Sequence, residues 1–379
     1  MKKIVIAIDS FKGSISSAEA GQAAKDGVLS VLPKCEVIQF PIADGGDGVL
    51  DVLITAMQGR YIAVKAHNPL MELIDTRYGI SGNGKTALIE MAAVSGLTLI
   101  PQDKRNPMLT TTFGTGELIK YALDEGIRDF IIGIGGSATN DAGLGMLQAL
   151  GYRFYDKNNN VLGTGGNIMI DVESIDISDA HPALKKSCFT VVCDVNNPFY
   201  GTDGAAYVFA GQKGADDEMI AELDKGMRHI AKVIQCKTGK SIGNVAGAGA
   251  AGGLGGGLVA FFNDDLQNGI KLLLDKLDFK EKIRNADLII TGEGKADRQT
   301  TMGKVPFGIL QEAKKQNIPV ILIAGSIEDV EELNDVGFKG IFSVTPYPID
   351  LEQAMQADFT KQNITRLLTQ ICSVIKHNI

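Results

Sequence analysis

The sequence predicts an α/β protein built on a doubly wound parallel sheet, and three observations support this fold class. Short apolar runs rich in β-branched residues alternate with helical patterns at both ends of the chain. Glycine accounts for 45 of 379 residues and is concentrated where strands give way to loops. The chain is 45% hydrophobic and 22% charged, which is typical of a globular protein with a large core. We therefore expect a Rossmann-like domain that binds ligands beyond the carboxyl ends of its strands.

The first sixty residues predict a strand, a helix, a second strand and a second helix. The run Ile4–Ile8 is apolar and β-branched, as in a buried strand. Ser16 and Ser17, with Glu19 behind them, are typical of a helix start, because a serine hydroxyl and a following glutamate can cap the first turn. The expected elements are strands at 4–8 and 36–40 and helices at 18–32 and 49–57.

The pattern changes after Tyr61. Three short alternating segments separated by turn residues predict an antiparallel meander: 61–66, 75–80 and 86–91. Helices and strands follow less regularly, with helices expected at 115–125, 141–150 and 217–235, and strands at 130–134, 152–155 and 188–194. The segment 247–257 is the richest in glycine, and we expect it to permit close packing of a helix or loop near a ligand.

The last hundred residues return to regular alternation. Strands are expected at 287–291, 319–324 and 340–344, and helices at 305–316, 329–335 and 360–375. We therefore predict that the two ends of the chain, residues 1–61 and 281–379, form one Rossmann-like domain. Residues 62–280 are expected to form an inserted α+β domain.

Composition excludes several classes of protein. A net charge of −8 argues against nucleic-acid binding, which selects basic surfaces. No stretch of 18 uncharged apolar residues is present, so no membrane span is expected. The apolar run after Met1 is too short for a signal peptide, and the five cysteines form no CxxC pair. These features predict a cytoplasmic protein with reduced thiols.

The segment Ala286–Thr300 is the most informative about function. Its apolar strand runs into a loop with two glycines, two carboxylates and two cations. Glu293 and Asp297 are candidate ligands for a metal ion, since carboxylate oxygens bind hard cations. Three nearby cations could contact phosphate oxygens: Lys295, Arg298 and Lys304. Phosphoryl transfer depends on positioning and charge neutralisation, and this mixture of groups suits it.

Two stretches match known nucleotide-binding motifs. Gly79–Thr86 fits the P-loop expression, but the preceding segment 72–78 alternates and carries three charges, and Asn83-Gly84 is typical of a hairpin turn. A hairpin tip is therefore favoured there, and a P-loop small-molecule kinase remains an alternative.

Gly133–Ala138 resembles the dinucleotide-binding fingerprint and follows a predicted strand. Asp156 lies roughly 20 residues further on, where a ribose-binding acid would be expected. A nicotinamide-dependent oxidoreductase that uses these residues is a second alternative. Against it, the polar segment 139–141 occupies the position at which a helix should pack tightly.

Taken in order, the glycine-bearing and acidic segments resemble the blocks of the bacterial glycerate kinases of the type 1 family. The resemblance covers residues 3–375. The matching segments are Asp9–Ser14, Ala43–Gly46, Ile89–Ala92, Gly114–Glu117, Gly133–Thr139, Gln212–Ala215 and Thr291–Gly294. The chain departs from the family at Asp47, where the family usually has a glutamate, and the shorter side chain keeps the charge.

The resemblance implies ATP-dependent phosphorylation of glycerate with Mg²⁺, in a cleft between two α/β domains. The implied product is 2-phosphoglycerate, although the residues themselves do not choose between O2 and O3. The family has no P-loop, in agreement with a hairpin at 79–86. The implied partners are glycerate and ATP, and the chain could act as a homodimer.

Chemical requirements suggest a role for each candidate residue. The attacking hydroxyl needs a carboxylate to accept its proton, and Asp194 is the first candidate, with Asp44 or Asp47 as the second. Lys12 is the third catalytic candidate, because it lies at a predicted helix N-terminus, where a cation can meet the substrate carboxylate and phosphates. Substrate binding is expected at Asp9, Ser10, Lys12, Gly13 and Asp47. ATP is expected to contact Gly135, Gly136, Ser137, Thr139, Gly292, Gly294 and Lys304, with the metal at Glu293 and Asp297.

Overall fold

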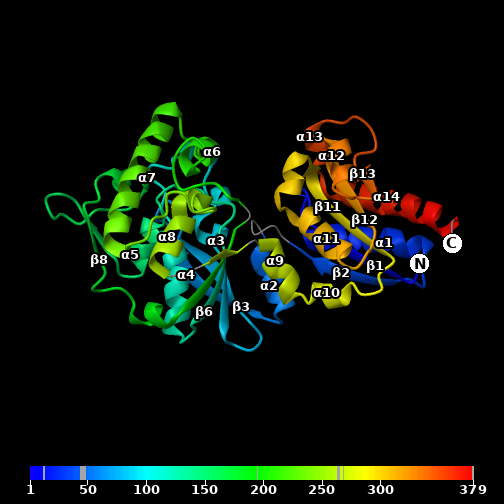
Figure 1. Cartoon of the computed structure of the whole chain (residues 1–379), viewed down its shortest axis with the longest axis horizontal. Helices are drawn as coiled ribbons and strands as arrows, with labels where there is room; N and C mark the ends of the chain where they lie inside the picture. Colours follow the sequence, from blue (N-terminus) through cyan, green and yellow to red (C-terminus); the bar gives the residue numbers. More distant parts are fainter. Residues whose placement is uncertain (12, 43–47, 194, 263–264, 268, 378–379) are drawn as a thin grey trace. The chain divides into compact units, whose positions relative to one another are not determined.

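The computed structural model describes the whole chain except residues 12, 43–47, 194, 263–264, 268 and 378–379 (Figure 1). It confirms the α/β fold class. Contacts divide the chain into two compact units, Met1–Asp44 with Ile270–Ile379 (unit 1) and Gly45–Gly269 (unit 2). Each unit contains its own sheet.

Unit 1 is a parallel five-stranded sheet formed by both ends of the chain. Its spatial order is β13-β12-β11-β1-β2. The strands are β1 (Lys3–Ile8), β2 (Glu36–Pro41), β11 (Leu288–Ala296), β12 (Val320–Ile327) and β13 (Gly340–Ser343). The chain adds β2 on one side of β1 and all later strands on the other side. The order therefore reverses between β1 and β11, which is the topological switch point at which open α/β sheets bind ligands.

Helices cover both faces of this sheet, as a doubly wound fold requires. All five side chains from Ile4 to Ile8 are fully buried, because β1 has an apolar layer on either side. Helices α1 (Ser17–Val31) and α14 (Ala357–His377) pack against each other on one face, and α11 (Val305–Lys314) packs on β1, β11 and β12. The shorter helices are α9 (Gly269–Lys276), α10 (Phe279–Lys282), α12 (Val330–Asp335) and α13 (Leu351–Ala354).

The predicted start of α1 is confirmed. Ser16 accepts a hydrogen bond from the backbone N–H of Glu19, and the Glu19 carboxylate accepts from the backbone N–H of Ser16. This reciprocal capping box satisfies two amides that the helix itself leaves unpaired. Hydrogen bonding to Ser16 also lowers the pKa of Glu19.

Strand β11 is longer than the sequence predicts. The segment after Thr291 was expected to be a loop, but it continues as strand to Ala296. The extension pairs with β12, with Glu293 opposite Ala324 and Lys295 opposite Ser326. The carboxylate of Glu293 is therefore fixed by strand geometry and does not depend on a flexible loop.

Unit 2 is built on a six-stranded mixed sheet of order β10-β9-β6-β5-β4-β3. Its strands are β3 (Arg60–His67), β4 (Leu73–Ile80), β5 (Thr86–Glu90), β6 (Asp129–Gly133), β9 (Cys188–Val192) and β10 (Asp265–Gln267). The first three are antiparallel, as predicted for the meander, and the last four run parallel to one another. Strands β7 (Arg153–Tyr155) and β8 (Ser174–Asp176) form a separate two-stranded sheet.

The helices of unit 2 surround this sheet. They are α2 (Val49–Ala56), α3 (Ala92–Ser95), α4 (Phe113–Asp124), α5 (Leu144–Ala149), α6 (Ala205–Phe209), α7 (Asp217–Thr238) and α8 (Leu254–Phe262). Helix α2 contacts β4 and β5, and the amides of Gly48 and Leu50 each donate to the Glu90 carboxylate at 3.1 Å. These contacts place the division between the units before α2, whereas the sequence placed it after residue 61. The second division falls at the start of α9, whereas the sequence placed it after residue 280.

The P-loop alternative for Gly79–Thr86 is wrong. Strands β4 and β5 pair directly across the turn, with Gly79 opposite Leu88 and Ile80 opposite Ala87. The Asn83 side chain accepts from the backbone N–H of Lys85, which closes the turn. The motif therefore lies at the tip of a hairpin, and no helix follows it as a P-loop requires.

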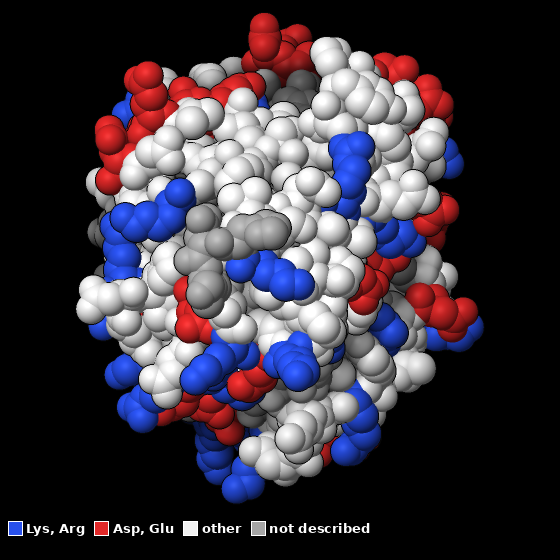
Figure 2. Space-filling model, turned by 90° about the vertical axis from the view of Figure 1, so that its right-hand side faces the viewer, with Lys and Arg blue, Asp and Glu red and all other residues white. Residues whose placement is uncertain are grey.

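Charged side chains of both signs lie on the face of the molecule drawn in Figure 2. Among the described side chains on this face, Asp and Glu gather along the upper edge, whereas Lys and Arg lie over the middle and lower parts with further Asp and Glu between them. Lys361 of α14 pairs with Glu19 of α1 at 3.7 Å, but an exposed pair contributes only about 0–1 kcal/mol. The contact between α1 and α14 therefore rests on apolar packing and on side-chain hydrogen bonds such as that from the Thr365 hydroxyl to the carbonyl of Ala23.

No described helix has the length and apolar character needed to cross a membrane.

The hairpin geometry predicts that Lys85→Ala has little effect on catalysis. Lys85 is exposed at the tip, and its loss should leave the rate of phosphate transfer expected from the resemblance within about tenfold. A P-loop lysine, by contrast, stabilises transition-state charge and its removal should reduce the rate on the order of 10³-fold. Rates and melting curves of the variant and the parent protein measure this. A loss near the larger figure, in a variant that melts normally, would contradict the hairpin interpretation.

Candidate active site

The candidate site lies at the switch point of unit 1, where β1 ends beside Gly292 and β11 continues past it to Ala296. The backbone N–H of Asp9 donates to the carbonyl of Gly292 at 2.9 Å, and the Thr291 hydroxyl donates to the carbonyl of Ala7 at 2.7 Å. These two bonds hold the end of β1 and the residue after it against the middle of β11. A pocket of about 660 Å³ is lined there by residues from the carboxyl ends of four strands. The polar residues that line the pocket are Asp9, Ser10, Ser14, Glu293, Lys295, Lys304, Ser326, Thr345 and Thr360.

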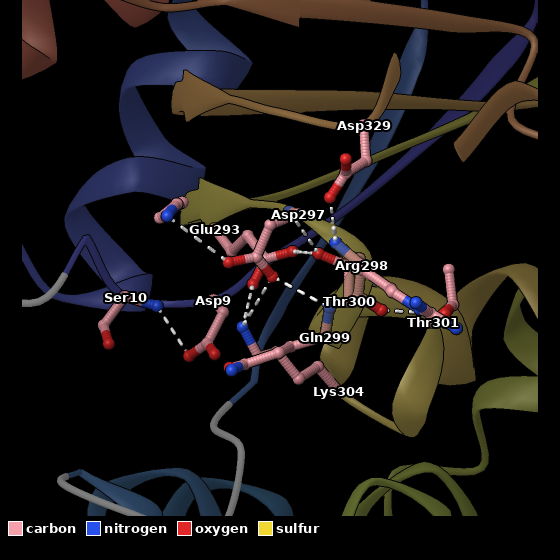
Figure 3. Close-up of polar contacts among 11 residues, drawn as sticks. Asp9, Ser10, Glu293, Asp297, Arg298, Gln299, Thr300, Thr301, Lys304 and Asp329 are labelled. Carbon is pink, nitrogen blue, oxygen red and sulfur yellow. Dashed lines mark hydrogen bonds and ion pairs between the residues drawn. The ribbon is translucent and has the colours of Figure 1, made fainter. Parts of the chain in front are cut away.

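Two carboxylates and one lysine lie close together here, and two of the three, Glu293 and Lys304, line the pocket. Lys304 Nζ lies 3.5 Å from Glu293 Oε2 and 3.8 Å from Asp297 Oδ1. Thr300 Oγ1 donates to the other carboxylate oxygen of Glu293 at 2.6 Å. Figure 3 shows the three charged side chains pointing toward one another, with Asp9 on the adjoining segment after β1. The structure thus brings Glu293, Asp297 and Lys304 together.

Burial controls the protonation of Glu293. The side chain is only 8% exposed, and this burial raises the pKa of its carboxyl group above the ordinary value. The hydrogen bond from Thr300 and the charge of Lys304 act in the opposite direction and lower the pKa. A divalent cation at this point would act as Lys304 does and favour the charged carboxylate.

Asp297 also has a structural role. It is the N-cap of the short 3₁₀ helix η7 (Arg298–Met302) and accepts from the backbone N–H of Gln299 at 2.9 Å. The hydroxyl of Thr300 accepts from the Asp297 backbone N–H at 3.1 Å, which completes a capping box. Thr300 therefore links the two carboxylates, since it also donates to Glu293.

The other two cations of this segment have different partners. Lys295 lines the pocket but pairs with Glu328 at 3.0 Å and with Asp297 at 3.6 Å. Arg298 pairs with Glu332 of α12 at 3.5 Å. Lys304 is therefore the cation that directly neutralises both carboxylates.

The far wall of the pocket is apolar. It is formed by Val344, Ile349, Leu351, Ala354, Met355 and Phe359. Gly13, predicted to bind substrate, contacts this wall: its φ is +79°, and a side chain there would overlap the methyl group of Met355. Ser14, one residue further, is 2.7 Å from the hydroxyl of Thr360. A pocket with one charged and one apolar wall suits a ligand with both characters.

Gly292 and Gly294 differ in what surrounds them. Gly294 lines the pocket. Gly292 lies inside β11, where a side chain would overlap the backbone and side chain of Ile323 in the next strand. The glycine at 292 is thus required for strand packing, and its carbonyl holds Asp9.

A second group of predicted residues lies in unit 2, in the loop that follows β6. The loop is anchored by two backbone bonds of 2.9 Å, from Leu97 N to Gly136 O and from Ala138 N to Ser95 O. Gly136 is exposed and adopts a φ of +74°, and Gly135 and Ser137 are half-buried. Thr139 is fully buried, and its hydroxyl oxygen has no hydrogen-bond partner among the described residues.

Sequence reasoning gave no role to Lys213, although Gln212–Ala215 is one of the segments that carry the resemblance. Lys213 ends the 3₁₀ helix η5 (Gly211–Lys213) and is only 2% exposed. Its Nζ donates to Ser137 Oγ and to the carbonyl of Thr139, both at 2.7 Å. The available signal was that Lys213 lies in a short segment, Gln212–Ala215, that matches the family.

The remaining candidates, Lys12, Asp44, Asp47 and Asp194, lie outside the described residues. Among the residues that are described, no group of three or more His, Cys, Asp or Glu is placed to hold a metal ion. Mg²⁺ commonly takes only one or two protein carboxylates together with water and phosphate oxygens, so the pair Glu293 and Asp297 fits that ion.

The dinucleotide-binding alternative finds no support in the position of Asp156. Strand β7, which precedes Asp156, is not part of the sheet that contains β6. The Asp156 carboxylate accepts from the backbone N–H groups of Asn158 and Asn160 at 2.8 Å, in its own turn. A ribose-binding acid would instead end the strand next to the glycine-rich loop.

The charge balance around Glu293 predicts a specific effect of Lys304→Met. Because the folded pKa of Glu293 is raised, the folded protein keeps a proton that the unfolded chain has already lost, and the free energy of unfolding falls as pH rises through the folded pKa. Removing Lys304 should raise this pKa further and extend the loss of stability to higher pH. Melting temperatures at a series of pH values above the ordinary pKa of a glutamate measure the effect, with the Glu293→Gln/Lys304→Met double variant as the control. If the melting temperatures of the single and double variants depend on pH in the same way, the pKa of Glu293 does not cause the effect, and the prediction is wrong.

Comparison with known proteins agrees with the resemblance seen in the sequence. The model of the glycerate kinase family matches residues 4–376. The chain is 45% identical to the glycerate 2-kinase of Escherichia coli (strain K12), with 98% of each chain covered. It is 46% identical to the glycerate kinase of Bacillus subtilis (strain 168), with 93% of each covered. A crystal structure of a glycerate kinase 2 from Salmonella typhimurium LT2 superposes with a TM-score of 0.86 at 42% identity, covering 100% of this chain and 99% of that one. This chain therefore belongs to the glycerate kinase family.

Proposed function

We propose that this protein transfers a phosphoryl group from ATP to glycerate and that 2-phosphoglycerate is the product. The observation that carries the proposal is the cluster of Glu293, Asp297 and Lys304 at the switch-point pocket, in a chain that matches the glycerate kinase family from residue 4 to 376. Phosphoryl transfer needs positioned charges more than it needs covalent chemistry, and this cluster supplies charges of both signs. The name of the E. coli relative, a glycerate 2-kinase, supports O2 as the acceptor.

The shape and character of the pocket favour a nucleotide within it. A volume of about 660 Å³ is far larger than a three-carbon acid requires. The apolar wall that contains Met355 and Phe359 suits the adenosine portion of ATP, and Lys304 and Gly294 suit its phosphates. The glycine-rich loop of Gly135, Gly136, Ser137 and Thr139 is the second proposed contact for phosphate oxygens.

The acceptor substrate is assigned to the segment after β1. Asp9, Ser10 and Gly13, with Lys12 and Asp47, are the proposed contacts of glycerate, whose carboxylate requires a cation and N–H donors. Its attacking hydroxyl must give up a proton, and Asp194 is the proposed acceptor, with Asp44 as the next candidate.

Mg²⁺ is the proposed cofactor, and Glu293 and Asp297 would hold it. Both carboxylates already face one cationic centre, Lys304, within 4 Å, so the two acids can serve a shared cation. When bound, the ion would neutralise phosphate charge as the bond to the leaving group breaks. Lys304 would then be available to the phosphate oxygens.

The direct test is ADP release by the purified protein, measured with a coupled assay. We expect ADP only when glycerate, ATP and Mg²⁺ are all present, and none with glycerol, which keeps the hydroxyl groups but lacks the carboxylate. ³¹P NMR of the product distinguishes the acceptor, because an O2 ester couples to one carbon-bound proton and an O3 ester to two. ADP release at the same rate without glycerate would identify an ATPase and contradict the proposal.

The metal assignment is tested by repeating the assay against Mg²⁺ concentration with Glu293→Gln and Asp297→Asn. Each amide keeps the volume of the acid but removes the charge, so the Mg²⁺ concentration for half-maximal rate should rise on the order of tenfold. Glu332→Gln is the matched control, because Glu332 pairs with Arg298 outside the cluster. Unchanged metal dependence in both amide variants would move the site to Asp44, Asp47 and Asp194.

A further inference from the structure

Lys213 occupies an unusual position for a lysine. Among the described residues it is the one buried lysine, and no carboxylate of those residues lies within ion-pair distance of it. Its two hydrogen-bond acceptors, Ser137 Oγ and the carbonyl of Thr139, are neutral and both belong to the loop that follows β6. Burying an ammonium group without an opposite charge is costly, so such a group usually has a function or a missing counter-ion.

The loop above Lys213 presents hydrogen-bond donors. The backbone N–H groups of Gly135, Gly136 and Ser137 donate to no acceptor in the described part of the chain. The positive φ of Gly136 turns the chain there, and successive N–H groups around such a turn form the concave arrangement that binds anions. The three residues are half-buried or exposed, so a ligand can reach them.

The bond from Lys213 also determines what Ser137 can do. Because the ammonium donates to Ser137 Oγ, the oxygen acts as acceptor in that bond, and the hydroxyl proton remains to be donated elsewhere. The loop then carries three N–H donors and one O–H donor, with a positive charge directly behind the hydroxyl. A group of acceptor oxygens with negative charge can satisfy all of these donors at once.

We infer that Lys213 is the positioning residue of an anion site formed by Gly135, Gly136 and Ser137. It fixes the loop through Ser137 and Thr139 and places a positive charge behind the site. The ligand is an oxyanion, which is a phosphate group of ATP or the carboxylate of glycerate. This inference rests on the proposed function for the identity of these two sources.

The environment of Lys213 agrees with this role. Burial lowers the pKa of Lys213 to about 7, and Asp141 is the one charged group of the described residues that opposes the shift. The Asp141 carboxylate accepts from the backbone N–H groups of Gly143 and Gly145 in its own loop and of Thr112 at the start of α4, so its oxygens already have hydrogen-bond partners. An anion bound at Ser137 would favour the charged form of Lys213 and raise its pKa, so anion binding near pH 8 should take up a proton.

The loop that follows β6 packs closely against the glycine-rich segment 247–257, which restricts its movement. A side chain at Gly252 would overlap the carbonyl of Thr139, and the backbone N–H of Ala142 donates to the carbonyl of Gly252 at 3.0 Å. The glycine-rich segment 247–257 thus permits the close packing that its sequence predicts, and it does so under the carbonyl that Lys213 binds.

The kinetic test compares Lys213→Met, Ser137→Ala and a control, Lys240→Met. Lys240 is a lysine of the same unit that donates to the carbonyl of Val259. We expect Lys213→Met to raise one KM by about 10- to 100-fold, since a charge-assisted hydrogen bond is lost, and to change the other KM little. Ser137→Ala should raise the same KM by a smaller factor. An increase in KM for ATP identifies the phosphate, and an increase in KM for glycerate identifies the carboxylate.

A binding measurement separates this inference from the proposed function. Isothermal titration with ATP–Mg²⁺ alone and with glycerate alone, in two buffers of different ionisation enthalpy at about pH 8, counts protons taken up on binding. We expect uptake with one ligand by the parent protein and by Lys240→Met, and none by Lys213→Met. If the parent protein binds but does not phosphorylate glycerate, the proposed function fails while this measurement still decides the role of Lys213.

Two results together would overturn the inference. The KM values for ATP and for glycerate of the folded Lys213→Met and Ser137→Ala variants would stay within twofold of those of Lys240→Met. The proton uptake of Lys213→Met on binding would also equal that of the parent protein. Should Lys213→Met fail to fold, Ser137→Ala decides, because it removes the hydroxyl donor and leaves the lysine bonded to Thr139.

Discussion

The parallel pairing of β1 with β11 is the constraint on which unit 1 and its site depend. It joins segments 284 residues apart through the bond from Thr291 to Ala7, and the backbone amides of Lys2 and Lys3 donate to Asp287 at the start of the same pair. All of unit 2 is inserted between these two strands. Strand order reverses at this pair, so no connecting segment covers the carboxyl ends of β1 and β11. Asp9 and Glu293 both line the pocket there.

The two units carry chemically different groups. Unit 1 presents carboxylates balanced by Lys304, beside a pocket with an apolar wall. Unit 2 presents backbone and hydroxyl donors backed by a buried lysine. Phosphoryl transfer requires both kinds: acids that can hold a cation against the phosphates, and donors that meet the phosphate or substrate oxygens directly. The glycines of both regions serve packing as well, since Gly292 and Gly252 each admit a neighbouring backbone that a side chain would block.

Local sequence pattern predicted those parts of the fold that local forces determine. The strand at Ile4–Ile8, the capping box at Ser16 and the hairpin around Asn83 follow from apolar periodicity and turn chemistry, and the structure contains each of them. The extension of β11 to Ala296 could not be predicted, because a polar, glycine-containing segment becomes a strand only through its partner β12. The same reason applies to the site. Glu293, Asp297 and Lys304 are close in sequence and were predicted together, whereas Lys213 meets Ser137 only through the folding of unit 2.

The central claim is that the nucleotide binds at the switch point of unit 1. Hydrogen–deuterium exchange with and without ATP–Mg²⁺ tests it most directly, because it reports protection of backbone amides segment by segment. Nucleotide binding at the switch point should slow exchange at residues 9–15 and 293–304 and leave the hairpin tip, residues 81–85, unchanged. Protection at the hairpin tip, with none in the two switch-point segments, would contradict it.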